Sequence, residues 1–99
     1  MGKQVHTEAE LYAVYVLWLR GLSQMQIAAR LDKRRAQVTG IIDRSPYRNR
    51  SVMTDGERQK HLDVLLANRA AKEDTLDKGL LVPRDFRIAH LEGNQIRGN

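Results

Sequence analysis

Polar and basic side chains on one short stretch of this chain could hydrogen-bond to the edges of DNA bases. Arginine can donate two hydrogen bonds to O6 and N7 of guanine, and glutamine can pair in the same two-bond manner with adenine. Thr39 and Gly40 would continue the same face one turn further along, and Gly40 would let the backbone come close to DNA. We therefore expect base readout from a set of five neighbouring positions: Arg34, Arg35, Gln37, Thr39 and Gly40.

A second set of polar and basic residues surrounds the first and suits the phosphate backbone. Phosphate contacts position a protein on a duplex, whereas base contacts give specificity. Gln24 would lie in the first turn of a helix, where free amides and the helix dipole favour an anion. The expected phosphate contacts are Gln24, Arg30, Lys33, Arg44, Arg48 and Arg50.

The net charge of the chain is concentrated in its first half. Residues 1–52 hold nine Lys or Arg against four Asp or Glu, whereas residues 53–99 hold eight of each. The whole formal excess of +5 therefore belongs to the segment with the candidate DNA contacts. A local basic excess favours a polyanionic partner, although the same charges could simply form a solvated surface.

Local signals place these residues on helices. Thr7, Ser23 and Thr54 are each followed three residues later by Glu or Gln, which is the pattern of a capping box at a helix start. We expect a first helix after Thr7 with an apolar stripe through Leu11, Val14 and Trp18, and with Gly21 in the left-handed conformation at its end. Trp18 is expected to serve the core rather than to stack on a base. The other expected helices run over 24–31, from about 34 to 44, and from 55 onward.

The second and third expected helices have the residues of a helix-turn-helix motif. Ala28 is small where the two helices would cross, and apolar Ile27, Leu31, Val38 and Ile41 would hold both against the first helix. At the turn, Asp32 would adopt the left-handed conformation, which Asp tolerates moderately well. Gly40 is unfavourable inside a helix. Close approach of the backbone to DNA or to the first helix would explain it, and the alternative is a flaw that the helix tolerates. A plain three-helix bundle is the alternative.

We therefore expect an all-α chain with two parts. Residues 1–52 would form a three-helix, helix-turn-helix DNA-binding domain. Residues 53–99 would add a fourth helix and a partly irregular tail that serves packing or oligomerisation. In the tail, a turn at Lys78 and Gly79 would lead to a short last helix from Pro83 to Leu91.

The sequence offers little for catalysis. It has no cysteine, and His6, His61 and His90 lie far apart without metal-ligand spacing. It has neither a phosphate-binding glycine loop nor an arguable Ser-His-Asp set. We expect no enzyme activity, catalytic residue, metal or cofactor. The chain has no apolar run typical of a signal peptide or a membrane span, so a cytoplasmic location is expected.

Part of this pattern resembles a known family. Residues 17–31 and 38–44 are similar to the N-terminal DNA-binding domain of GcrA-type cell-cycle regulators, which has Trp before Gly-Leu-Ser, then Gln-Ile-Ala, then a Val-x-Gly-x-x-x-Arg helix. The resemblance covers residues 8–50 and implies DNA recognition by the third helix. In that family it also implies contact with RNA polymerase through its sigma factor. The matching residues are Trp18, Gly21, Leu22, Ser23, Gln26, Ile27, Ala28, Leu31, Val38, Gly40 and Arg44.

The function expected from the sequence is that of a small, sequence-specific, DNA-binding transcriptional regulator of bacterial or phage type. Its partner would be double-stranded DNA, with no membrane partner. The fourth helix would either pack across the first three or form a homodimer through Leu62, Leu65 and Leu66. Sigma-factor region 4, resolvase tails and phage terminase small subunits share the pattern more loosely. The alternatives are therefore an assembly protein like a DNA-packaging terminase small subunit, or an adaptor that binds a sigma factor or RNA polymerase with the same fold.

Overall fold

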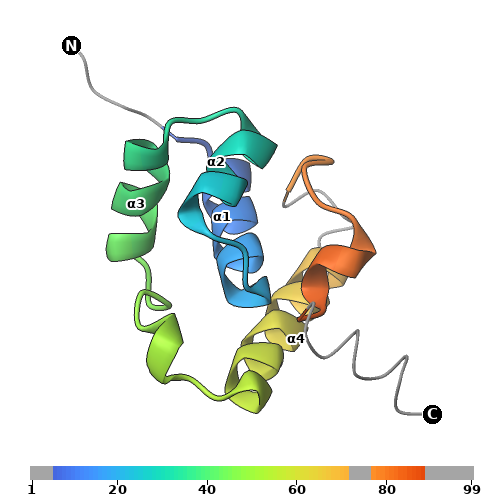
Figure 1. The fold of residues 1–99 in the computed structure, drawn as a ribbon. Coiled ribbons are helices and arrows are strands. Elements are labelled where there is room, and N and C mark those ends of the chain that lie inside the picture. Colours follow the sequence, from blue (N-terminus) through green and yellow to red (C-terminus); the bar gives the residue numbers. More distant parts are fainter. Residues whose placement is uncertain (1–5, 72–76, 89–99) are drawn as a thin grey trace.

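The structure is a computed structural model that describes residues 6–71 and 77–88, and in these ranges it is helical, without strands (Figure 1). The expected all-α class is confirmed. No helix in the described part of the chain has both the length and the apolar character needed to cross a membrane. The elements are α1 (Glu8–Arg20), α2 (Gln24–Leu31), α3 (Arg35–Asp43), η1 (Arg50–Val52), α4 (Asp55–Ala71) and η2 (Pro83–Phe86), where η denotes a 3-10 helix.

The three predicted capping boxes are confirmed. At the start of α1, the amide of Glu10 donates to Thr7 Oγ1 at 3.1 Å, and the amide of Thr7 donates to Glu10 Oε1 at 2.9 Å. Equivalent pairs of bonds open α2 and α4. Helix α3 begins one residue later than expected, because Arg34 is its N-cap and donates its amide to Gln37 Oε1 at 2.9 Å.

Helix α1 is the centre of the fold. It contacts α2, α3, α4 and η2, and Figure 1 shows it between α3 and α4. The expected single apolar stripe was wrong: the buried residues surround most of the helix, whereas Leu11 and Trp18 of the expected stripe are only half-buried. A helix that is apolar on nearly every side must be covered on nearly every side. The residues of α1 that are buried are Ala9, Tyr12, Ala13, Val14, Val16, Leu17 and Leu19.

The residues after position 52 belong to the same core. Leu62 of α4 and Phe86 of η2 are buried in one apolar cluster with Ile27 and Val38. The hydroxyl of Tyr12 also donates to the carbonyl of Leu65 at 2.6 Å, which ties α1 to α4. The proposed parts 1–52 and 53–99 thus share one interior over the described residues.

The end of the described chain differs from the expected helix. The predicted turn at Lys78 and Gly79 is present, with φ of 50° and 85°. From Pro83, however, only the 3-10 turn η2 forms, and Arg87 is already extended. The amide of Ile88 donates to the side chain of Gln59 at 3.2 Å rather than to a helical carbonyl. The remainder of the predicted helix, and the predicted end of α4 near residue 73, lie outside the described residues.

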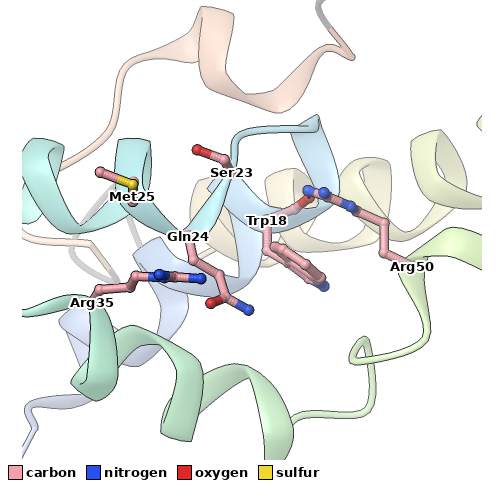
Figure 2. A pocket seen from close by; sticks show the side chains of 6 residues that line it. All are labelled: Trp18, Ser23, Gln24, Met25, Arg35 and Arg50. Atoms are coloured by element: carbon pink, nitrogen blue, oxygen red, sulfur yellow. The ribbon is translucent and has the colours of Figure 1, made fainter.

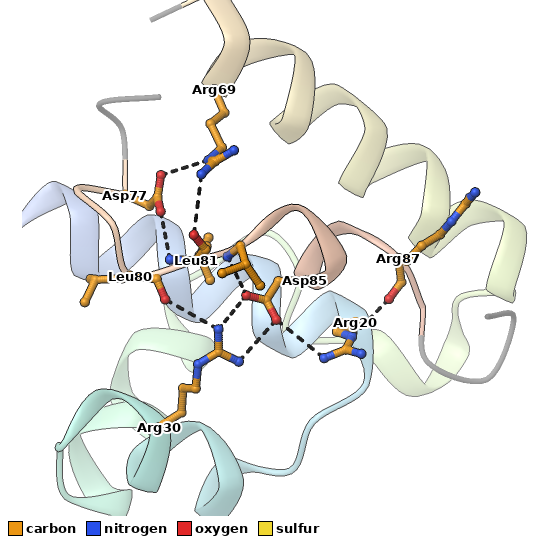
Figure 3. A network of polar contacts seen from close by, with 9 residues as sticks. Arg20, Arg30, Arg69, Asp77, Leu80, Leu81, Asp85 and Arg87 are labelled. Carbon is orange, nitrogen blue, oxygen red and sulfur yellow. Dashed lines mark hydrogen bonds and ion pairs between the residues drawn. The ribbon is translucent and has the colours of Figure 1, made fainter. Parts of the chain in front are cut away.

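Two buried aspartates fasten residues 77–88 to the helices (Figure 3). Asp85 is 1% exposed and accepts from Arg30 Nη1 at 3.1 Å, from Arg20 Nη1 at 3.4 Å and from the amide of Val82 at 2.9 Å. A carboxylate is stable in such a place only when its oxygens are paired and hydrogen-bonded. Asp85 therefore links η2 to both α1 and α2.

Asp77 forms a second fastening of the same kind. It is fully buried, and it accepts from Arg69 Nε at 3.0 Å and from the amide of Leu81 at 2.8 Å. The segment 77–88 is thereby held to α4 as well.

Replacing Asp85 should destabilise the whole chain. We expect Asp85→Asn to lower the free energy of unfolding by about 2–4 kcal/mol, because two arginines lose their buried counter-ion. Urea unfolding followed by circular dichroism measures this. Asp43→Asn is the matched control, since Asp43 is exposed, and it should change the free energy by less than about 0.5 kcal/mol. Equal stabilities for the two variants would contradict the assigned role of Asp85.

Candidate nucleic-acid interface

Helices α2 and α3 are held at a tight turn by buried contacts. Asp32 ends α2 with φ of 56° and ψ of 49°, so the predicted left-handed residue is confirmed. The amide of Lys33 then donates to the carbonyl of Ala28 at 2.9 Å. Ile27 and Val38 are fully buried where the two helices meet the core. The inner faces of α2 and α3 are therefore fixed, and their outer faces remain for binding.

The N-terminal half of α3 is the exposed part of this pair. Arg34, Arg35 and Ala36 are all exposed, and the last two border a shallow groove together with Thr39. Because Ala36 is small, the backbone of α3 could come close to a ligand here. Two arginines at the start of a protruding helix suit the major groove, which admits one α-helix.

Two candidate base contacts already have partners within the chain. Gln37 Oε1 accepts the amide of Arg34, and Thr39 Oγ1 donates to Gln24 Oε1 at 2.6 Å. The bond between Thr39 and Gln24 joins α3 to the first turn of α2. These side chains consequently help to shape the surface, whether or not they also touch a base.

A second hollow lies where α2, α3 and the following loop meet (Figure 2). In Figure 2, Arg35 approaches from α3 and Arg50 from the opposite side, with Gln24 between them. The exposed guanidinium group of Arg35 therefore lies on one side of a polar amide, and Arg50 forms the opposite wall. The lining residues of the hollow are Trp18, Ser23, Gln24, Met25, Arg35 and Arg50.

Met25, a residue that is 66% exposed beside this hollow, was not among the contacts expected from the sequence. The sequence could have indicated that Met25 is exposed, because residues two apart on a helix do not face the same way. With Ile27 on the buried side of α2, Met25 had to point outward.

Arg50 is held by contacts within the chain. Its Nη1 donates to the carbonyls of Trp18 at 2.7 Å and Leu22 at 2.8 Å, and its guanidinium lies 3.6 Å from the centroid of the Trp18 ring. Burial lowers the pKa of Arg50 below its ordinary value, and the nearby charge of Arg58 lowers it further. Arg50 therefore closes the end of α1 and covers Trp18.

Trp18 in turn holds the loop that follows α3. Its indole Nε1 donates to the carbonyl of Tyr47 at 2.8 Å, and its half-buried ring packs against the core. It thus has the packing role expected from the sequence, at the edge of the core rather than inside it.

Two other expected phosphate contacts also have intramolecular partners. Arg30 pairs with Asp85 as described above. Lys33, whose side chain is 9% exposed, lies 3.2 Å from Glu10 Oε1 and 3.0 Å from His6 Nδ1. The pKa of Glu10 is lowered, chiefly by the hydrogen bond from the Thr7 backbone and further by Lys33.

The expected phosphate surface is therefore smaller than the sequence suggested. We leave Arg30, Lys33 and Arg50 out of it, because their charged groups are engaged inside the molecule. Arg44 and Arg48 are exposed and stay in the set, as does Gln24 at the start of α2. The partners of Arg30 and Arg50 lie at least 28 residues away in the sequence, so local patterns could not reveal them.

Gly40 does not lie against the first helix. A Cβ atom at this position would meet only the guanidinium of Arg44, at 3.8 Å, which is ordinary van der Waals contact. Close approach to α1 is thus excluded, and two explanations stay open: close approach to DNA, or a glycine that the helix simply tolerates.

Within the described residues, no group of three or more His, Asp or Glu side chains could hold a metal ion. Comparisons with protein-family models, with curated proteins and with solved structures found no match to this chain. The resemblance to GcrA-type regulators thus stays an expectation from the residue pattern.

The role of Arg50 can be tested by a conservative change. We expect Arg50→Lys to lower the free energy of unfolding by about 1–2 kcal/mol, because an ammonium group cannot reproduce the planar stacking and the paired carbonyl bonds. Trp18 is the single tryptophan, so its fluorescence emission should shift to longer wavelength as its cover is lost. Arg48→Lys, two residues away on the exposed loop, should change neither quantity. If Arg50→Lys behaves like this control, the structural assignment fails.

Proposed function

We propose that this chain is a small, sequence-specific DNA-binding protein that acts in transcriptional regulation and uses α3 as its recognition helix. The observation that carries the proposal is the outer face at the start of α3. There, Arg34 and Arg35 are exposed beside a groove, while Val38 and Ile41 on the inner face are buried. The basic excess of residues 1–52 supports the same conclusion.

The mode of binding follows from this arrangement. Helix α3 enters the major groove with its N-terminal end, where Arg35 can donate two hydrogen bonds to one guanine. Ala36 leaves room for a base edge next to it, and Thr39, which is hydrogen-bonded to Gln24, lines the same hollow one turn later. Arg34, at the N-cap, is placed between base edges and backbone.

The phosphate contacts come from the elements on either side of α3. The start of α2 offers amide groups and Gln24 to one strand, as helix N-termini do for anions. Arg44 at the end of α3 and Arg48 in the next loop face the other strand. Such contacts fix register without reading sequence.

The resemblance to GcrA-type regulators adds a partner to the proposal. In that family the DNA-binding domain works together with RNA polymerase through a sigma factor, and we propose such a contact here as a consequence of the resemblance. Leu62 and Leu65 are buried within the chain, so a homodimer through α4 would have to use its exposed residues, such as Val64 and Leu66.

Base readout and phosphate contact can be separated by two arginine variants. A target is first selected from a pool of random duplexes with the wild-type chain, and affinities are then measured for the selected and a scrambled duplex. Arg35→Ala should cost about 1–3 kcal/mol on the selected duplex and much less on the scrambled one. Arg48→Ala should weaken both duplexes alike and reduce the slope of log affinity against log salt by about one.

Arg87→Ala is the control for loss of one surface charge, because Arg87 is exposed on the segment that lies across α1 from α3 (Figure 1). It should leave both affinities nearly unchanged. Failure of the selection to enrich any sequence would overturn sequence-specific binding. Equal losses from Arg35→Ala and Arg87→Ala would overturn the placement of the interface on α3.

A further inference from the structure

All three tyrosines of the chain, Tyr12, Tyr15 and Tyr47, line one hollow between α1, α4 and the loop after α3. Glu8 and Leu65 complete its walls, together with Leu11 and Pro46. The hollow has no residue in common with the α3 groove or with the hollow of Figure 2. It is thus a separate surface feature that the proposed DNA binding does not use.

The aromatic rings of this hollow are held in place from behind. The hydroxyl of Tyr12 is bonded to the carbonyl of Leu65, and the main chain of Tyr47 receives the hydrogen bond from Trp18. Tyr15 and Tyr47 pack edge to face, with centroids 5.6 Å apart and an angle of 64° between their planes. A ligand would therefore meet an aromatic wall that is already ordered, which reduces the entropy cost of binding.

The electrostatic character of the hollow is opposite to that of the chain. No Lys or Arg is among its described lining residues, although the chain carries a formal net charge of +5. Glu8 is exposed at the hollow, and the described part of the chain gives its carboxylate no hydrogen-bond or ion-pair partner. Burial raises the pKa of Tyr47 and raises that of Tyr12 to about 12, so these phenols are neutral near pH 7.

We propose that this hollow docks a protein partner by one arginine side chain of that partner. Ring faces attract a guanidinium group, Glu8 supplies the counter-charge, and Leu11 and Leu65 receive the aliphatic stem. Nucleic acid does not suit the site, because its phosphates would meet Glu8 and find no Lys or Arg among the described lining residues. An uncharged apolar side chain would leave Glu8 unused.

The test compares arginine with citrulline, its neutral counterpart of almost the same shape. The probes are acetyl-Leu-Arg-Leu-amide and the same peptide with citrulline, titrated into the full chain and followed by NMR. Saturable shifts are expected at the three tyrosine rings, with the citrulline peptide binding about threefold or more weakly. Equal affinities for the two peptides would overturn the proposal. So would n-butylguanidinium binding as tightly as the arginine peptide, because that result indicates a site for small cations.

Two variants that each remove one negative charge distinguish a specific effect of Glu8 from an effect of net charge. Glu8→Gln should weaken the arginine peptide about threefold or more and leave the citrulline peptide unchanged. Asp43→Asn, at the exposed end of α3, should leave both affinities unchanged. If the two variants weaken the arginine peptide equally, the effect is one of overall charge and the proposal fails. DNA affinity should not change in Glu8→Gln, so this test is independent of the proposed DNA binding.

Discussion

The burial of α1 is the constraint on which the rest of this structure depends. Residues 11–19 are apolar or aromatic without interruption, so exposing any face of this helix to water costs free energy. Ninety-nine residues supply few elements with which to cover it. As a consequence α2, α3, α4 and η2 are all arranged around α1, and each of them contacts it.

This arrangement explains why so many arginines work inside the molecule. Covering one helix from several sides leaves chain ends and turns that need polar fastenings, and arginine can reach two acceptors at once. Arg30 fastens η2 to α2 through Asp85, and Arg50 fastens the loop after α3 to the end of α1. Arg58 adds another such bond by donating to the carbonyl of Leu19 at 2.9 Å. A basic composition is thus not by itself a measure of the basic surface available to a partner.

The sequence was most informative where structure is decided locally. The capping residues Thr7, Ser23 and Thr54 predicted three helix starts correctly, and Asp32 predicted the left-handed turn, since each signal involves only neighbouring residues. The burial of Ile27 and Val38 also followed from helical spacing. The exposed start of α3 could therefore be located in advance, because a helix whose inner face is known has a known outer face.

The sequence was least informative where two distant segments meet. The extent of the buried surface of α1 depends on α4 and η2, and the roles of Arg30 and Lys33 depend on partners that the spacing of residues does not indicate. The tyrosine hollow is of the same kind, because Tyr12 and Tyr47 come together only when α3 and its loop have folded against α1.

Trp18 separates the two candidate surfaces and fixes both. One side of its ring carries Arg50 and borders the hollow beside α2 and α3, while its indole nitrogen holds the main chain of Tyr47 in the wall of the other hollow. A residue at the edge of the core can serve in this way because it is neither free to move nor hidden. The loop from Pro46 to Arg50 therefore belongs to both surfaces, and its shape sets how Arg48 and Tyr47 are presented to the two proposed partners.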